Sequence, residues 1–169
     1  ITSRASRADD PDYKQGWGVV RLGSLPSDIT AIRGHWAEEA VDWAFTAGIT
    51  DGCPMVGVLT CPELAVTRDE MAQFLWRFRD TPLATMASSF DDVVAGGSYG
   101  PAVDWLTEEG ITLGCTTTRY CPDGTVTRAE MAAFLWRLEN SPGGSPPAGF
   151  ADLPIGSFAR SAVDWLLAS

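Results

Sequence analysis

Two arginines occupy matching sequence contexts, and they are the residues of this chain best suited to bind an anion. Arg68 lies within Val66–Met71 and Arg128 within Val126–Met131, and each stands between a threonine and a glutamate. A threonine N-cap with a glutamate at the third helical position is the capping-box pattern, which predicts that each arginine opens a helix. The threonines and glutamates of the two boxes are Thr67, Glu70, Thr127 and Glu130.

Helix capping explains the threonines and glutamates of these boxes but not the arginines, because a cation is disfavoured beside the positive end of a helix dipole. A carboxylate ligand would reward both arginines, since the guanidinium and the free amide groups of the first helical turn can donate hydrogen bonds to it together. A salt bridge to an acidic neighbour is the alternative. Both interpretations stay open at this level.

The rest of the sequence offers little chemistry. His35 is the only histidine, and neither a glycine-rich phosphate loop nor a paired-histidine metal motif occurs. We therefore predict no catalytic residue, no metal site and no cofactor within these residues.

The four cysteines form two pairs, Cys53 with Cys61 and Cys115 with Cys121. We predict a disulfide in each pair, which would stabilise a small unit by about 2 to 3 kcal/mol and would require an oxidising compartment. Zinc ligation is an alternative, but the spacings are not those of CxxC knuckles, and one histidine cannot complete two ligand sets. Free thiols are the other alternative.

The elements that position these residues belong to a repeat of about 60 residues. Ala40–Trp43 recurs at Ala102–Trp105 and again at Ala162–Trp165, and Gly48–Cys53 matches Gly110–Cys115 at all but one position. Two helices cannot bury their apolar faces alone, so we expect neighbouring repeats to pack on one another.

Each full repeat predicts two helices. The first runs from near Trp36 to Ala47, with apolar residues at helical spacing and Gly48 placed to end it. The second begins at the capping box and carries an apolar stripe of its own. The predicted apolar positions are Trp36, Ala40, Trp43 and Ala47 in the first helix, and Met71, Phe74, Leu75 and Phe78 in the second, with Met131, Phe134, Leu135 and Leu138 as counterparts in repeat two.

The recurring tryptophans and aspartates of the first helix have the same neighbours in every copy. We predict core packing for Trp43, Trp105 and Trp165, with stacking on sugar rings as the alternative. We predict that Asp42, Asp104 and Asp164 are solvated or helix-capping side chains and not catalytic acids. Trp76 and Trp136 lie one step off the second-helix stripe, at positions suited to the seam between units.

Charge limits the classes of partner. Twelve Lys and Arg against 22 Asp and Glu give a net charge of −10, which repels nucleic acid and anionic membranes at long range. An anionic ligand must therefore be captured locally, by individual arginines. The sequence has no apolar run of about 18 residues, so we expect no membrane insertion and see no signal peptide. We interpret the chain, which begins at Ile1, as a piece of a longer secreted protein.

The repeats divide the chain into four segments. Residues 1–26 are a linker or the tail of an upstream domain, residues 27–82 are repeat one, residues 83–144 are repeat two, and residues 145–169 begin a third, truncated repeat.

Taken in order, these motifs resemble the S-layer homology (SLH) repeat. The resemblance rests on Trp36-Ala37, on the Gly-Ile-x-x-Gly segments that begin at Gly48 and Gly110, and on Cys-Pro followed by Val-Thr-Arg-x-Glu-Met. Repeat two, with Phe90-Asp91-Asp92 and Pro122-Asp123-Gly124, is the closer match. The resemblance implies an all-α fold in which tandem helix-loop-helix repeats pack as a pseudo-threefold helical bundle.

The resemblance also implies a function, the non-covalent anchoring of an exported protein to an acidic, often pyruvylated, cell-wall polysaccharide. The polymer would lie in grooves between repeats, with positive charge from Arg68 and Arg128 and with Gly52 and Gly114 lining the grooves. The protein would then be extracellular, at the cell surface or cell wall. Repeat one departs from the family pattern, because Asp69 adds negative charge beside Arg68 where repeat two has Ala129. We therefore expect the stronger site at Arg128.

Two other interpretations remain. Asp12–Val20 faintly resembles the stretch that closes many subtilisin-like protease domains, which would make these repeats the anchoring tail of a secreted serine peptidase. A purely structural role, as a spacer or oligomerisation module without a sugar ligand, is the third. The sequence leaves the oligomeric state open.

Overall fold

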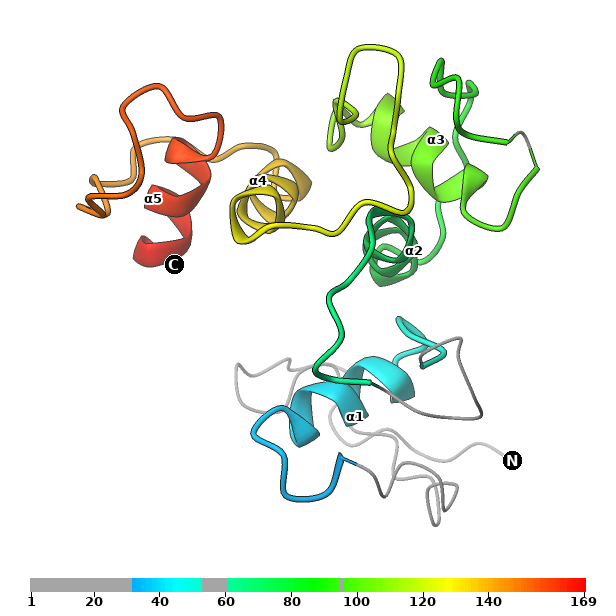
Figure 1. Cartoon of the computed structure of the whole chain (residues 1–169), viewed down its shortest axis with the longest axis horizontal. Helices are drawn as coiled ribbons and strands as arrows, with labels where there is room; N and C mark the ends of the chain where they lie inside the picture. Colours follow the sequence, from blue (N-terminus) through cyan, green and yellow to red (C-terminus); the bar gives the residue numbers. More distant parts are fainter. Residues whose placement is uncertain (1–31, 53–60, 95) are drawn as a thin grey trace, which may run out of the picture. The chain divides into compact units, whose positions relative to one another are not determined.

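The structure, a computed structural model, describes residues 32–52, 61–94 and 96–169. These ranges contain five α-helices and no β-strand, so the predicted all-α class is confirmed for them (Figure 1). The helices are α1 (Glu38–Thr46), α2 (Arg68–Phe78), α3 (Gly100–Glu108), α4 (Arg128–Leu138) and α5 (Arg160–Ala168). The stretch that resembles a protease terminus, Asp12–Val20, lies outside the described residues.

The chain divides into two compact units, residues 1–64 and 65–169. In the first unit α1 begins at Glu38, and Gly48, with φ of +71°, follows its end as predicted. The predicted apolar face is wrong at Trp36, whose side chain is 89% exposed, and Trp43 is also 48% exposed. Trp36 precedes the first helical residue, in a turn closed by the bond from Glu38 N to His35 O, so helical spacing does not govern where its ring points.

The second unit holds α2 to α5. Both capping boxes form as predicted, with the main-chain N–H of Thr67 donating to Glu70 (2.9 Å) and that of Thr127 donating to Glu130 (2.9 Å). These bonds fix where α2 and α4 begin, at Arg68 and Arg128. The two arginines therefore occupy the first helical positions that the sequence predicts.

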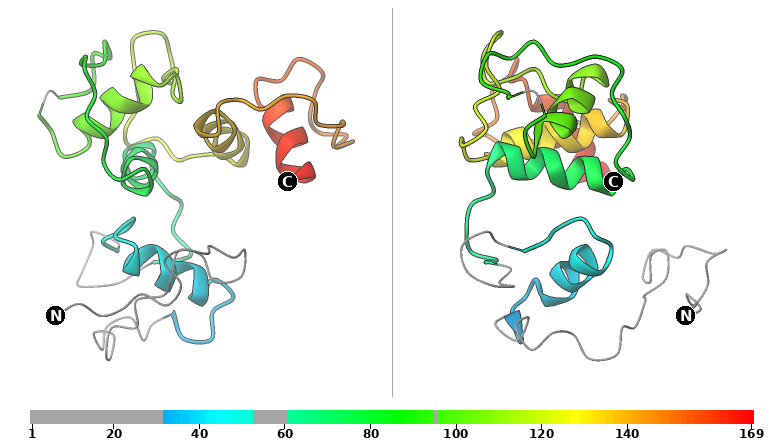
Figure 2. Two further views of the ribbon diagram at one scale, coloured as in Figure 1. Left: turned by 180° about the vertical axis from the view of Figure 1, so that it is seen from behind. Right: turned by 90° about the vertical axis from the view of Figure 1, so that its right-hand side faces the viewer.

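Helices pair across the repeat boundaries of this unit. The second helix of one repeat packs against the first helix of the next, α2 against α3 and α4 against α5 (Figure 2). α2 and α4 also run parallel, because Arg68 meets Glu130 at their amino ends and Arg79 meets Glu139 at their carboxyl ends. Figure 1 shows both helices nearly end-on. A complete threefold arrangement of repeats stays a prediction.

One apolar core joins α2, α3 and α4. Trp105 is buried as predicted, whereas Trp165 is only partly buried and Phe78, at the end of the α2 stripe, is half exposed. The core residues are Met71, Ala72, Leu75, Phe90, Ala102, Val103, Trp105, Leu106, Ile111, Tyr120, Phe134 and Leu138. None of the helices in the described ranges is both long enough and apolar enough to cross a membrane.

Candidate functional site

Arg68, at the start of α2, is enclosed by residues of repeat two. Its side chain is among the most buried charged groups of the structure, with the residue only 4% exposed. The guanidinium donates from Nε to the carbonyl of Tyr120 (2.8 Å) and from Nη1 to Oε1 of Glu130 (2.8 Å). It also lies over the rings of Tyr120 and Phe134, 5.0 and 5.5 Å from their centroids. Four contacts therefore hold this cation inside the protein.

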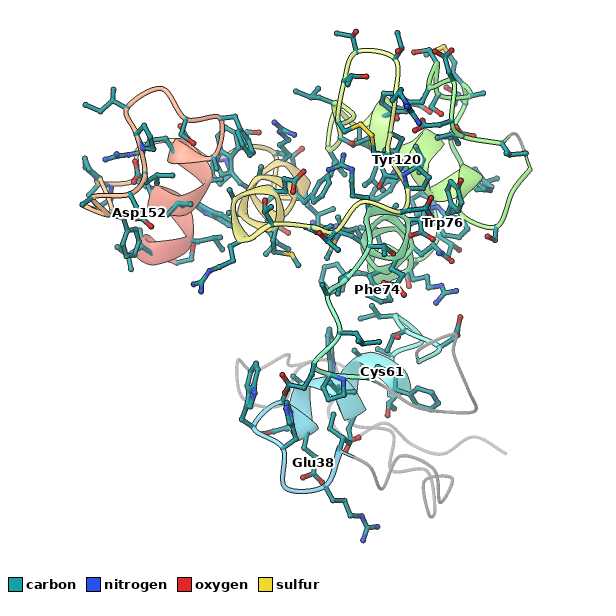
Figure 3. All side chains as sticks on the ribbon, viewed as in Figure 1. Glu38, Cys61, Phe74, Trp76, Tyr120 and Asp152 are labelled. Carbon is teal, nitrogen blue, oxygen red and sulfur yellow. A yellow bond between two sulfur atoms is a disulfide. The ribbon has the colours of Figure 1, made fainter. Side chains whose placement is uncertain are left out.

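The main chain at the start of α2 is joined to the same loop. The amide of Arg68 donates to Gly124 O (2.8 Å), and the amide of Asp69 donates to Pro122 O (3.1 Å). The hydroxyl of Tyr120, a fully buried residue that Figure 3 labels, donates a bond to Arg68 O (2.6 Å). The first-turn amides that would otherwise be free to hold an anion thus already have acceptors.

These contacts form a joint between repeat one, at Arg68, and repeat two, at Tyr120 and Glu130, and the Arg68 charge affects the protonation of Glu130. Burial alone would raise the pKa of the Glu130 carboxyl, but hydrogen bonds from Thr127 and the charge of Arg68 outweigh it and lower that pKa. Glu130 is therefore ionised at neutral pH and forms a charge-assisted bond with Arg68. Burial also raises the pKa of Tyr120, so its hydroxyl stays protonated and can donate.

The loop that carries Tyr120 is braced by Asp92. This carboxylate accepts from the amides of Tyr120 (2.7 Å) and Cys121 (2.9 Å) and from Nε of Arg119 (3.4 Å). Burial raises the pKa of Asp92, but these donors outweigh it, and the net effect is to lower the pKa. The Asp92 side chain thereby fixes the backbone at Cys121, whose φ of +59° is unusual for a residue other than glycine.

The predicted disulfide of repeat two is confirmed, and it closes the same loop. Cys115 and Cys121 are bonded, with their Cα atoms 6.0 Å apart. In repeat one Cys61 is disulfide-bonded, but its predicted partner, Cys53, lies outside the described residues.

Gly114 directly precedes the first cysteine of this loop, and contacts within the protein explain why it has no side chain. Its φ is +75°, and a Cβ atom there would lie 2.5 Å from Thr116 O, 2.6 Å from Arg119 O and 2.6 Å from the ring of Phe90. A groove for sugar is not needed to explain glycine here. Gly52, its counterpart, also has positive φ (+91°) and lies in the first unit.

Arg128, at the start of α4, has a different environment. Its side chain is exposed, and no ion pair or hydrogen bond reaches its guanidinium from the described residues. Its own amide and that of Ala129 also have no acceptor in the described part of the chain, whereas the amide of Glu130 donates to Thr127 Oγ1 (3.2 Å). A guanidinium and two amides at one helix end can together bind a carboxylate.

The predicted site residues are thus divided between two places. The structure brings Arg68 and Glu130 together across repeats, while Thr127 and Arg128 are exposed to solvent. Glu130 belongs to both places, because it also bonds Thr127 in the capping box. Asp104 and Asp164 are neither helix caps nor free, since their Oδ1 atoms accept from Ser88 N (2.7 Å) and Ala148 N (2.7 Å). Each of these two hydrogen bonds ties the first helix of a repeat to the segment that precedes it.

Sequence reasoning missed Tyr120 and Asp92 as the residues that shape the joint. Repeat one has Thr60 where repeat two has Tyr120, so a search for residues shared by the two repeats does not select the tyrosine. Asp92 was visible only as part of the Phe90-Asp91-Asp92 family mark. An aromatic residue directly before a cysteine, with an acidic residue upstream, was the available signal.

Comparison with known families identifies one segment. Residues 89–132 match the family model described as the S-layer homology domain, which confirms the resemblance for that part of repeat two. No protein in the curated collection matches the chain.

Proposed function

From the premise that residues 89–132 are an S-layer homology domain, generally an anchoring module for the cell wall or envelope, we propose that this chain anchors a secreted protein by binding an acidic wall polysaccharide. The carboxylate of the polymer, from a uronic acid or a pyruvate ketal, is the recognised group. Arg128 is its principal contact.

The observation that carries this proposal is the unpaired amino end of α4. Arg128 is exposed, and its amide and that of Ala129 have no acceptor among the described residues. Because the chain has a net charge of −10, long-range attraction does not supply an anion, so a local donor cluster is required. The helix dipole adds to the positive potential at the same point.

Arg68 serves the same function indirectly. Its guanidinium is buried against Glu130 and Tyr120, so its charge is satisfied internally. In this proposal Arg68 holds α2 in position relative to α4, and Arg128 contacts the ligand. Thr127 and Glu130 then hold the helix end on which Arg128 lies, through the capping box.

Sedimentation with purified cell walls tests the proposal. The chain should sediment with walls that retain their polysaccharide and should stay in solution with walls from which the acidic polymer has been extracted. Arg128→Ala should weaken the binding about tenfold, the loss expected when one charge-assisted contact is removed.

Arg33→Ala is the matched control, because it removes the same charge from another exposed position. The proposal fails if the chain ignores intact walls, which would favour a spacer without a sugar ligand. It also fails in its assignment of Arg128 if both variants lose binding equally, since net charge alone would then account for the effect.

A further inference from the structure

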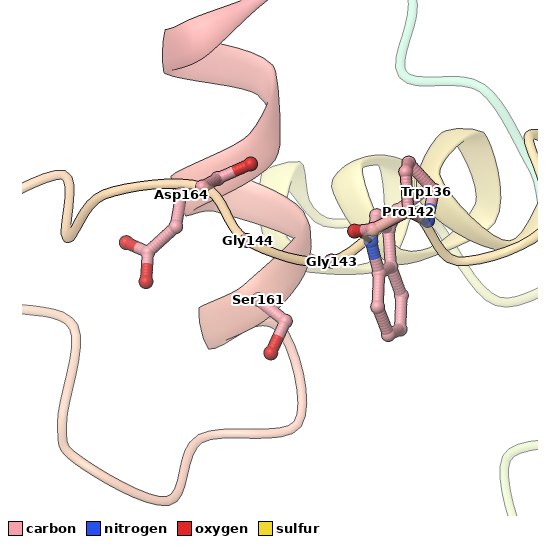
Figure 4. A pocket seen from close by; sticks show the side chains of 7 residues that line it. Trp136, Pro142, Gly143, Gly144, Ser161 and Asp164 are labelled. Carbon is pink, nitrogen blue, oxygen red and sulfur yellow. Dashed lines mark hydrogen bonds between the residues drawn. The ribbon is translucent and has the colours of Figure 1, made fainter.

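A pocket lies at the other end of α4, where the helix meets the loop to α5. Its volume is about 110 Å³, and its lining includes Trp136, Gly143, Gly144, Ser145, Ser161 and Asp164. Figure 4 shows the indole of Trp136 on one side and the side chains of Ser161 and Asp164 on the other. Trp136 lies eight residues after Arg128, or about 12 Å along the helix axis. The pocket is therefore separate from the amino end of α4.

The groups in this pocket suit a ligand that both donates and accepts hydrogen bonds. The indole N–H of Trp136 donates to Pro142 O (2.8 Å), which fixes the ring. The hydroxyls of Ser145 and Ser161 have no partner among the residues that the structure describes. Asp164 accepts from Ala148 N (2.7 Å) and Arg160 Nε (3.2 Å), and these bonds lower its pKa, so it is an ionised acceptor.

The equivalent place at the end of α2 lacks these free groups. Trp76 donates its indole N–H to Pro82 O (2.8 Å), as Trp136 does to Pro142 O. There, however, Thr85 stands at the position that matches Ser145, and its hydroxyl is not free, because it donates to Oε1 of Glu108 (2.5 Å). Pro101 stands in the place of Ser161 and has no hydroxyl. The two tryptophans thus share one geometry but not one set of neighbours.

We propose that the Trp136 pocket binds an uncharged hexopyranose residue of the wall polymer, at a second point about 12 Å along α4 from the acidic residue held at Arg128. Sugar rings present C–H groups that pack on an aromatic face and hydroxyls that both donate and accept, which matches the indole, the two serine hydroxyls and the carboxylate. At about 110 Å³ the pocket is smaller than a typical small-molecule site, so it would enclose only part of one sugar ring. Asp164 is paired with Arg160, so the lining of the pocket offers no unpaired cation to an acidic sugar. This inference rests on the proposed function.

Nuclear magnetic resonance of the ¹⁵N-labelled chain tests it, with the indole N–H signals as probes. Methyl glycosides of glucose, galactose and mannose are titrated separately, and methyl glucuronide is the acidic comparison. At least one neutral glycoside should shift the Trp136 signal, identified with Trp136→Phe, more strongly than the glucuronide. Trp76, which makes the same hydrogen bond, is the internal control and should not move.

Ser161→Pro should weaken the neutral glycoside about fivefold, because it removes one hydroxyl partner. The change copies Pro101, which occupies the same position in α3, so the helix should still form. Ser89→Ala, at an exposed serine elsewhere, should leave the titration unchanged. The inference is wrong if no neutral glycoside shifts Trp136, if Trp76 shifts equally, or if the glucuronide binds better. Wall sedimentation that persists in that case would leave the anchoring proposal standing.

Discussion

The amino ends of α2 and α4 have nearly the same sequence and opposite surroundings. Both carry a threonine cap, an arginine at the first helical position and a glutamate two residues later. Arg68 is buried by Tyr120, Glu130 and Phe134, whereas Arg128 is exposed with no partner in the described residues. The capping box therefore determines where a helix begins, and the neighbouring repeat determines what the arginine does.

This difference also explains why an arginine is tolerated beside the positive end of a helix dipole. At α2 the cost is offset by an ionised carboxylate, a carbonyl and two aromatic rings. At α4 no described group offsets it, which leaves the charge available to a ligand. One motif thus supplies a joint between repeats in one copy and a candidate binding group in the other.

The largest predicted effect is the loss of stability in Arg68→Ala. The substitution leaves Glu130 without its cation and the carbonyl of Tyr120 without its donor, and losing one partner of a buried ion pair costs about 3 kcal/mol. Urea unfolding followed by circular dichroism measures the change. In a Glu130→Gln background the same substitution should cost at least about 1 kcal/mol less, because the two side chains interact. Additive effects would contradict the pairing.

Gly114→Ala should come next, with a loss of about 2 to 3 kcal/mol. A Cβ atom at this positive-φ residue meets two carbonyl oxygens and the Phe90 ring, so backbone strain and overpacking both contribute. Gly110→Ala is the matched control, because its φ is also positive (+68°) but its Cβ would meet nothing within 4 Å. It should cost only about 1 kcal/mol. Equal losses in the two variants would show that the loop yields to a side chain at Gly114 without cost.

A smaller effect is expected from pH, through Glu130. Its pKa in the folded chain is below the ordinary value of 4.5, so it stabilises the fold above that value, and the contribution is lost as the pH falls through the lowered pKa. The unfolding free energy of the parent chain should therefore decline across this acidic window, and that of Glu130→Gln should decline less. Urea unfolding at a series of pH values measures both curves. If the two curves run parallel, Glu130 does not contribute this pH dependence, and its pairing with Arg68 is contradicted.

Sequence alone predicts the local features of this protein well. The capping boxes, the helix class and the repeat-two disulfide follow from residue spacing, because each depends on neighbours close in the chain. The burial of Trp105 needs the core of α2, α3 and α4 as well, since Trp43, in the same local sequence, is 48% exposed. The fate of Arg68 does not, since Tyr120 and Glu130 lie 52 and 62 residues away. The exposure of Trp36 was also missed, because the period of an apolar stripe holds only inside the helix.

The smallest effect, and the one opposite in sign, is predicted for Arg128→Ala. No described group pairs with this side chain, and removing a cation from the first turn relieves its repulsion by the helix dipole, so the variant should be as stable as the parent or more stable by about 0.3 kcal/mol. Urea unfolding at low ionic strength, beside Arg68→Ala, measures the difference. Since salt screens an exposed charge, any gain should vanish in high salt. A loss above about 1 kcal/mol would mean that Arg128 has an internal partner, and the two helix ends would then be alike.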